Sequence, residues 1–223
     1  MRLPGRGLAG RVPGHRPAAT AGGHHHLFQV ARHPAEHGGP RAPTLHLDHW
    51  PGYKSGALNY ALRRMTSPEA EVIGIIDSDY QVQPGFLRRC APAFADPWIG
   101  FVQSPQDYRD WTQARYYRRL YYSYKYFFAV SQPSRNEHDG AIFAGTMGLI
   151  RRVALDELGG WDEWCITEDA ELSLRLLRAG WHGLHVDETF GHGIMPLTFE
   201  ALRASATGGA SAASRSCACT GAR

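Results

Sequence analysis

The stretch Glu71-Val72-Ile73-Gly74-Ile75-Ile76-Asp77-Ser78-Asp79 decides the fold class of this 223-residue chain. Its short apolar run is typical of a strand that is buried on both faces of a parallel sheet. Two carboxylates follow the run, and in open α/β folds ligands bind at the carboxyl ends of such strands. Because strand side chains two residues apart point to the same face, we expect Asp77 and Asp79 to face one ligand.

Helix and strand patterns alternate around this stretch. We predict helices over residues 54–65, 84–94, 112–130, 152–158 and 167–179, and another strand over 100–103. Thr167 fits the N-cap of the last predicted helix, and Gly180 fits its C′ position. This alternation predicts an α/β fold with a mostly parallel sheet.

The composition divides the chain into three parts. Residues 1–43 are rich in Gly, Pro, Arg, Ala and His and show little periodicity, so we expect them to be unfolded. Residues 44–203 carry the globular pattern and form the expected domain, whose size suits a single core. Residues 204–223 read as a low-complexity tail.

Charge, cysteines and hydropathy limit the class of protein. A formal net charge of +3 is too small to argue for a nucleic-acid partner. The four cysteines form no disulfide framework, which favours a reducing compartment. No window of the sequence offers the ~18 apolar residues that a bilayer span needs, and we expect no signal peptide.

Two sets of carboxylates are candidates for chemistry. Asp77 and Asp79 have the ligand type that Mg²⁺ or Mn²⁺ takes when phosphate oxygens and water complete the shell. A solvated turn after a strand is the alternative reading of Asp-Ser-Asp. At the start of the predicted 167–179 helix, the dipole would favour an ionised Asp169, which suits a general base. Simple helix capping is the alternative for Asp169, and Glu168 beside it either orients the site or is a surface residue.

Four ordered blocks between Tyr53 and Asp169 together resemble the catalytic core of cellulose-synthase-like family 2 glycosyltransferases, and the resemblance covers about residues 45–203. They are Tyr53-Lys54-Ser55-Gly56-Ala57-Leu58-Asn59, Ile75-Ile76-Asp77-Ser78-Asp79, Val102-Gln103-Ser104-Pro105-Gln106 and Trp161-Asp162-Glu163-Trp164-Cys165-Ile166-Thr167-Glu168-Asp169. The resemblance implies a GT-A fold, a Rossmann-like nucleotide-diphospho-sugar transferase core. The wording around 100–103, 146–147 and 164–172 is similar to bacterial β-glucan synthases.

The resemblance also implies a role for each matching residue. Catalysis falls to Asp169 as the base, with Glu168. The nucleotide sugar would be bound by Lys54, Asp77, Asp79 and Gln103, the two aspartates also holding Mg²⁺ or Mn²⁺. The acceptor would lie on Gly145, Thr146 and Trp164. For Gln103 a structural role, and for Lys54 an exposed position at a helix start, are equally open.

The implied reaction is metal-assisted, inverting transfer of a sugar from a nucleotide-diphosphate donor, expected to be a uridine-diphosphate sugar, to a glycan or lipid acceptor. The alternative is an inactive remnant that retains at most weak metal or nucleotide binding. Relatives of this kind sit at the cytoplasmic face of a membrane, so we expect membrane association of a longer parent protein. The basic, aromatic helix predicted over 112–130 then suits a membrane surface or missing helices better than nucleic acid.

Two family elements are not found at their expected places. Residues 1–43 contain no aspartate that could grip the uridine, and the Gln-x-x-Arg-Trp block that should follow Arg203 is replaced by residues 204–213. Those ten residues are compatible with codons that, read in a shifted frame, give Gln-Arg-Tyr-Arg-Trp. We therefore expect the tail to be frameshifted, a hypothesis that the nucleotide sequence tests.

Overall fold

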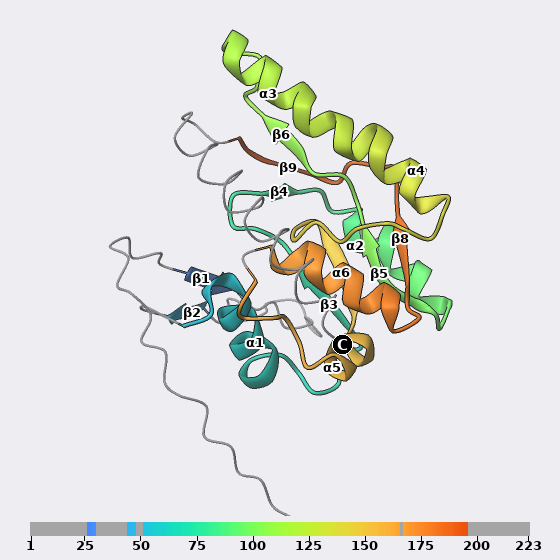
Figure 1. Ribbon diagram of the computed structural model, residues 1–223. Helices are drawn as coiled ribbons and strands as arrows, with labels where there is room; N and C mark the ends of the chain where they lie inside the picture. Colours follow the sequence, from blue (N-terminus) through green and yellow to red (C-terminus); the bar gives the residue numbers. More distant parts are fainter. Residues whose placement is uncertain (1–25, 30–43, 48–50, 166, 196–223) are drawn as a thin grey trace, which may run out of the picture.

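A computed structural model describes residues 26–29, 44–47, 51–165 and 167–195 of the chain (Figure 1). The expected tail 204–223 lies outside these residues, as does most of the segment 1–43. Within that segment, however, strand β1 (His26–Gln29) pairs antiparallel with β2 (Thr44–Leu47). Across the described residues, no helix is both long and apolar enough to span a membrane.

The central sheet has four strands in the order β3-β7-β5-β8. Their bounds are β3 (Val72–Ile75), β7 (Gly148–Arg151), β5 (Ile99–Gln103) and β8 (His182–His185). Only β5 and β8 are parallel, because β7 runs antiparallel to both of its neighbours. The expectation of a mostly parallel sheet is therefore wrong, and the sheet is mixed. An apolar run shows that a strand is buried but does not encode its direction.

A second, smaller sheet lies beside the first and has the order β4-β9-β6. Its strands are β4 (Gln81–Val82), β9 (Gly191–Ile194) and β6 (Asp107–Arg109). The pair β4 and β9 is antiparallel, whereas β6 and β9 are parallel. This sheet carries the segments that follow β3 and β5 along the chain, and it positions the turn that contains Asp79.

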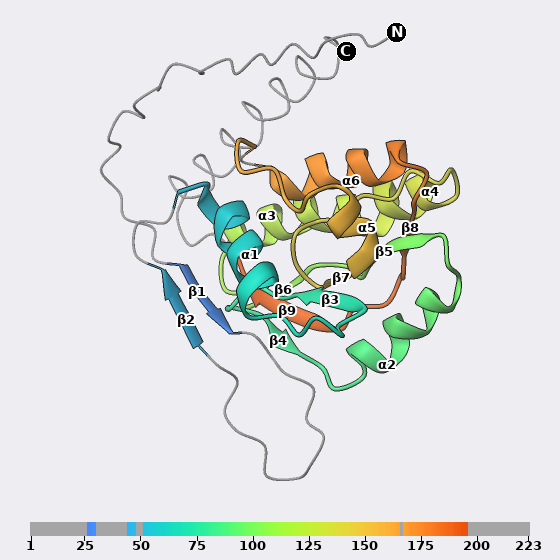
Figure 2. The same cartoon turned by 90° about the horizontal axis from the view of Figure 1, so that it is seen from below.

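Helices cover both faces of the central sheet (Figure 2). On one face lie α1 (Tyr53–Arg64), α5 (Arg152–Glu157) and α6 (Glu168–Arg178), and their apolar side chains share one core cluster with β3, β5 and β7. On the other face α2 (Phe86–Cys90) packs against β5 and β7 in a second cluster. The two clusters bury large side chains completely, among them Phe101 and Leu172 on the first face and Met147 on the second.

The boundaries of most predicted helices are confirmed within a few residues, but two are interrupted. The 84–94 prediction becomes α2 followed by the 3₁₀ helix η1 (Ala91–Ala95), where Pro92 cannot donate the hydrogen bond that an α-helix needs. The 112–130 prediction becomes α3 (Arg115–Tyr126), the π-helical turn η2 (Phe127–Ser131) and α4 (Gln132–Asn136). These three form one long element along the edge of the molecule (Figure 1).

The aromatic residues of α3 divide between two surfaces. On the inner surface Tyr121 stacks on Trp111 with ring centroids 4.1 Å apart, and Tyr124 packs on Tyr108 of β6. On the outer surface Tyr122 remains exposed beside arginines of the same helix. Most of the aromatic pattern seen in the sequence is thus explained by packing of α3 onto the smaller sheet.

Candidate functional site

Lys54 gathers three of the predicted blocks in one place. It lies in the first turn of α1, and its Nζ is 2.7 Å from Oδ1 of Asp77 and 3.9 Å from Oε1 of Glu168. The same ammonium donates to the carbonyl of Gly145 at 3.3 Å. Burial lowers the pKa of Lys54, but the carboxylates of Asp77, Glu168 and Asp169 outweigh burial and raise it. Lys54 is therefore a fixed positive charge among acidic side chains.

Asp77 and Asp79 leave β3 in a way that the sequence pattern did not predict. The strand ends at Ile75, and the amide of Tyr80 closes a turn onto the carbonyl of Asp77 at 3.1 Å. The alternation of strand side chains does not apply beyond the strand, so the expectation that the two carboxylates share one face lacks its premise. Asp77 turns toward Lys54, whereas Oδ2 of Asp79 accepts from the backbone amide of Ile194 in β9 at 2.9 Å.

Glu168 and Asp169 begin α6 at the position that the sequence predicts. Glu168 is buried, and burial, reinforced by the neighbouring Asp169, raises the pKa of its carboxyl to about 7 against the opposing effect of Lys54. Burial likewise raises the pKa of Asp169, although the amide of Ala170 and the ammonium of Lys54 act against it. The helix N-terminus was expected to lower the pKa of Asp169, but the effect of burial is larger and raises it. A raised pKa brings a carboxylate base closer to working pH.

Thr167 occupies the predicted N-cap position of α6. Its side chain, however, makes no capping hydrogen bond to the helix, and lies 3.6 Å from the sulfur of Cys165 instead. At the other end, Gly180 has the left-handed φ of 90° that the C′ position requires.

Gly145 lies directly against the candidate base. Its φ is +79°, and a Cβ atom added there would lie 2.8 Å from Oδ2 of Asp169. The next residue, Thr146, receives the amide hydrogen of Asp77 on Oγ1 at 2.8 Å. This segment therefore runs between Lys54 and Asp169, where the resemblance places the acceptor sugar, and any side chain larger than glycine would close that space.

A serine of α6 joins this segment to the candidate base. The hydroxyl of Ser173 accepts from the amide of Phe143 at 2.8 Å and lies 2.8 Å from the carbonyl of Asp169, to which it donates. Ser173 is fully buried, and its contact with Phe143 is shielded from water. Sequence reasoning missed this residue because serine within a helix carries no distinctive signal.

Gln103 forms hydrogen bonds to the backbone of the segment that contains Gly145. It is fully buried at the end of β5, its amide nitrogen donates to the carbonyl of Thr146 at 2.8 Å, and its amide oxygen accepts from the amide of Ala144 at 2.7 Å. Gln106 also bonds to the carbonyl of Ala144. These bonds fit the structural alternative that the sequence left open for Gln103, since the amide faces backbone on both sides.

Trp164 lies apart from the buried cluster. Its side chain is 90% exposed, and its backbone amide is held by Oδ1 of Asp162 at 2.9 Å. Among the described residues no group of three or more His, Cys, Asp or Glu side chains is placed to hold a metal ion. One oxygen each of Asp77 and Asp79 takes part in the bonds given above, which leaves the other oxygens for a cation completed by phosphate oxygens. Asp77 and Asp79 thus offer two carboxylates with different partners, which are fewer ligands than a metal site enclosed by protein needs.

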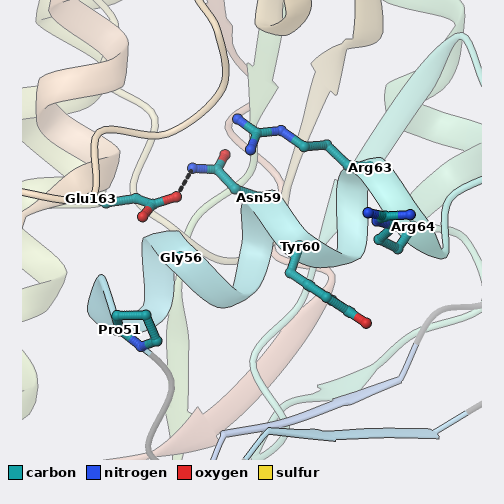
Figure 3. Close-up of a pocket in the computed structure, with 7 residues that line it drawn as sticks. All are labelled: Pro51, Gly56, Asn59, Tyr60, Arg63, Arg64 and Glu163. Carbon is teal, nitrogen blue, oxygen red and sulfur yellow. Dashed lines mark hydrogen bonds between the residues drawn. The ribbon is translucent and has the colours of Figure 1, made fainter.

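A second set of hydrogen bonds joins helix α1 to the segment that precedes α6. Sequence reasoning did not predict these bonds. Asn59 of α1 donates to Oε1 of Glu163 at 2.9 Å and to the carbonyl of Trp161 at 2.8 Å, while its oxygen accepts from the amide of Trp161 at 2.9 Å. Figure 3 shows Asn59 and Glu163 joined by this hydrogen bond, and both residues help to line a pocket beside α1. The available signal was a polar residue on the apolar face of a helix.

Comparison with known proteins gives one family. The model described as "Glycosyl transferase family group 2" matches residues 72–207, more than half of the chain. "Glucomannan 4-beta-mannosyltransferase 7" of Arabidopsis thaliana is 32% identical over 154 residues, covering 68% of this chain and 28% of that protein. "Probable glucomannan 4-beta-mannosyltransferase 4" of Oryza sativa subsp. japonica is 32% identical over 158 residues, covering 70% and 29%. The chain thus spans less than a third of the length of these relatives.

One solved structure has a weaker likeness. The mannosyltransferase PcManGT from Pyrobaculum calidifontis, in complex with GDP-Man and Mn²⁺, aligns with a TM-score of 0.47 and 23% sequence identity, covering 66% of this chain and 37% of that chain. A likeness at this level does not bear on the site.

Proposed function

Because the chain belongs to the glycosyl transferase family group 2, we propose that it carries the transfer site of a nucleotide-sugar glycosyltransferase. One observation supports this most directly. Lys54, Asp77 and Glu168 come from three separate blocks of sequence. The carboxylates of Asp77 and Glu168 nevertheless lie within 4 Å of the Lys54 ammonium nitrogen, and Asp169 follows Glu168 directly. The ammonium group suits a diphosphate, and the carboxylates beside it suit a hydroxyl nucleophile. Their place after the end of a strand is where ligands bind in open α/β folds.

In the proposed reaction Asp169 is the general base. Its carboxylate takes the proton of an acceptor hydroxyl whose oxygen bonds to the anomeric carbon, while the bond from that carbon to the diphosphate oxygen breaks, with inversion. Lys54 holds the phosphates, and Glu168 completes the acidic wall beside it. Asp77 and Asp79 would hold Mg²⁺ or Mn²⁺, which when bound supplies positive charge to the leaving diphosphate.

We propose mannose as the sugar and a β-1,4-linked glycan as the acceptor. This rests on the names of the plant relatives, which are 4-beta-mannosyltransferases of glucomannan. This proposal differs from the uridine-diphosphate sugar and the β-glucan product that the sequence resemblance implied. Both donors are therefore included in the test. A lipid acceptor and a location at the cytoplasmic face of a membrane remain predictions for a longer protein.

The test is a transfer assay with the full 223-residue chain, Mn²⁺ and a β-1,4-mannooligosaccharide, with GDP-mannose and UDP-glucose compared as donors. We expect chain extension with GDP-mannose and a loss of about 1,000-fold in Asp169→Asn, because removal of a positioned base typically has an effect of 10²–10⁴. Asp156→Asn is the matched control, since Asp156 pairs with Arg152 at 2.8 Å on the exposed side of α5. An Asp169→Asn enzyme as active as the wild type would contradict the assignment.

Nucleotide binding separates an enzyme from a binding-only remnant. We expect Lys54→Gln to weaken GDP binding about tenfold or more in calorimetry, because a charge-assisted contact to phosphate is removed. Lys125→Gln is the control. Lys125 lies on α3 and, like Lys54, forms an ion pair with an aspartate, Asp107, at 2.8 Å. GDP binding that depends on Lys54, without transfer from either donor, would establish the remnant alternative instead.

A further inference from the structure

Both donors of the Asn59 amide and one acceptor position of its oxygen are used by one short segment. Its nitrogen carries two donors, which go to Trp161 and Glu163, and its oxygen accepts from the backbone of Trp161. The carbonyl of Trp161 can only accept and its amide can only donate, so the orientation of the Asn59 side chain is fixed. Asn59 is only 3% exposed, and a buried amide satisfied in this way holds its partners in one arrangement.

The segment 158–163 is held from α6 as well. Arg175 donates to the carbonyls of Leu158 and Gly160 at 3.0 Å each, and its guanidinium is fixed by Glu171 at 2.6 Å. Gly160 has a φ of +91°, and a Cβ there would collide with the Asn59 amide oxygen. The backbone of this segment is therefore clamped between α1 and α6.

Glu163 extends this clamp to the start of α1. Its Oε1 meets Asn59, and its Oε2 would lie 2.8 Å from a Cβ on Gly52, the residue that caps α1. Gly52 and Asn59 are seven residues apart, which places them on one face of the helix. Glu163 therefore lies along the first two turns of α1, the part of the helix that carries Lys54.

We propose that Asn59 and Glu163 are positioning residues that fix the first turn of α6 relative to the first turn of α1. Glu163 precedes Glu168 by five residues, and Lys54 precedes Asn59 by five. The pair thus joins the element that holds the phosphates to the element that holds the base. This inference rests on the proposed function. It follows that binding and alignment depend on different residues. Lys54 and Asp77 bind the donor, and the Asn59–Glu163 contact aligns Asp169 for transfer.

The deciding variants are Glu163→Ala and Glu163→Gln, because Gln keeps an oxygen that accepts from Asn59. We expect Glu163→Ala to lower kcat about 10- to 100-fold, as small misplacements of a reacting group do. The KM for GDP-mannose and the Kd for GDP should change by less than about twofold, since no donor contact is removed. Glu163→Gln should restore most of the kcat. Glu157→Ala is the matched control, since Glu157 accepts from Trp181 at 3.1 Å on the exposed surface.

Hydrogen exchange gives a readout that does not need activity. We expect faster exchange over residues 162–172 in Glu163→Ala, and wild-type exchange in Glu163→Gln and Glu157→Ala. A Glu163→Ala enzyme with unchanged kcat, or with kcat and GDP affinity lowered together, would overturn the positioning role. A wild-type protein that transfers no sugar would overturn the proposed function instead, and exchange would still decide whether Glu163 fixes the first turn of α6.

Discussion

A Cβ atom on Gly145 would lie 2.8 Å from Oδ2 of Asp169, so the backbone of one residue forms the wall beside the candidate base. We expect Gly145→Ala to reduce transfer at least about 100-fold, because the methyl group displaces the base from a position that catalysis requires to within an ångström. The measurement is kcat together with the free energy of unfolding.

Gly159 provides the matched control for that substitution. Its φ of +77° is nearly that of Gly145, but no atom lies within 4 Å of its missing Cβ. Both alanine variants should lose about 1 kcal/mol of stability from the left-handed backbone. Only Gly145→Ala should lose transfer, and equal losses in both would indicate that strain alone is responsible.

The stability of the protein should depend on the ionisation of Glu168. Burial raises the pKa of this carboxyl to about 7, so the folded state binds a proton that the unfolded chain releases near pH 4.5. The contribution of Glu168 to stability is thus present below pH 4.5 and is lost as the pH rises to about 7. We expect the free energy of unfolding to fall by as much as about 3 kcal/mol across this window.

Glu168→Gln tests that pH dependence, because the amide does not titrate. Denaturant unfolding at several pH values should show a smaller decline between pH 4.5 and 7 in the variant than in the wild type. Glu157→Gln is the control, because Glu157 accepts from Trp181 at 3.1 Å on the exposed surface. Parallel curves for wild type and Glu168→Gln would contradict the raised pKa.

Asp79 should govern the metal dependence of donor binding. We expect Mn²⁺ to strengthen GDP binding in the wild type, and removal of Mn²⁺ with a chelator to abolish that gain. In Asp79→Asn the gain should fall about tenfold, because one anionic ligand of the cation is lost. Asp96→Asn is the control, since Asp96 also accepts from a backbone amide in a turn, that of Trp98 at 2.9 Å. An unchanged Mn²⁺ effect in Asp79→Asn would rule out this ligand.

Trp164 should contribute to the acceptor and not to the fold. With 90% of its side chain exposed, its removal should leave the melting temperature unchanged. We expect Trp164→Ala to raise the KM for the mannooligosaccharide about tenfold, since ring stacking contributes about 1 kcal/mol or more, with the KM for GDP-mannose preserved. Trp98, also strongly exposed, is the control. A raised KM in Trp98→Ala as well would point to a nonspecific effect.

Local signals explain which parts of the fold the sequence predicts. The apolar run before Asp77 and the helix that starts at Glu168 are encoded within a few neighbouring residues, and both are found. The direction of β7 is not encoded locally, because it depends on where the long excursion between β5 and β7 returns to the sheet. The expectation of a mostly parallel sheet rested instead on the alternation of helix and strand patterns along the sequence.

The site shows the same division. Lys54, Asp77, Glu168 and Asp169 were named from the sequence, and the structure brings their charged groups together. The separate orientations of Asp77 and Asp79 could not be read from the pattern, since they follow from a turn that begins after Ile75. The partnership of Asn59 with Glu163 joins residues 104 positions apart, and no spacing within either block indicates it.

The two bonds of Ser173 connect the backbone of the proposed base to Phe143, two positions before Gly145. We therefore expect a shift of α6 along its axis to displace Phe143 together with Asp169. Motion of this helix would then move the proposed base and the segment before Gly145 in the same direction. With the acceptor on that segment, as proposed, such coupled motion would preserve the distance between the proposed base and the acceptor hydroxyl.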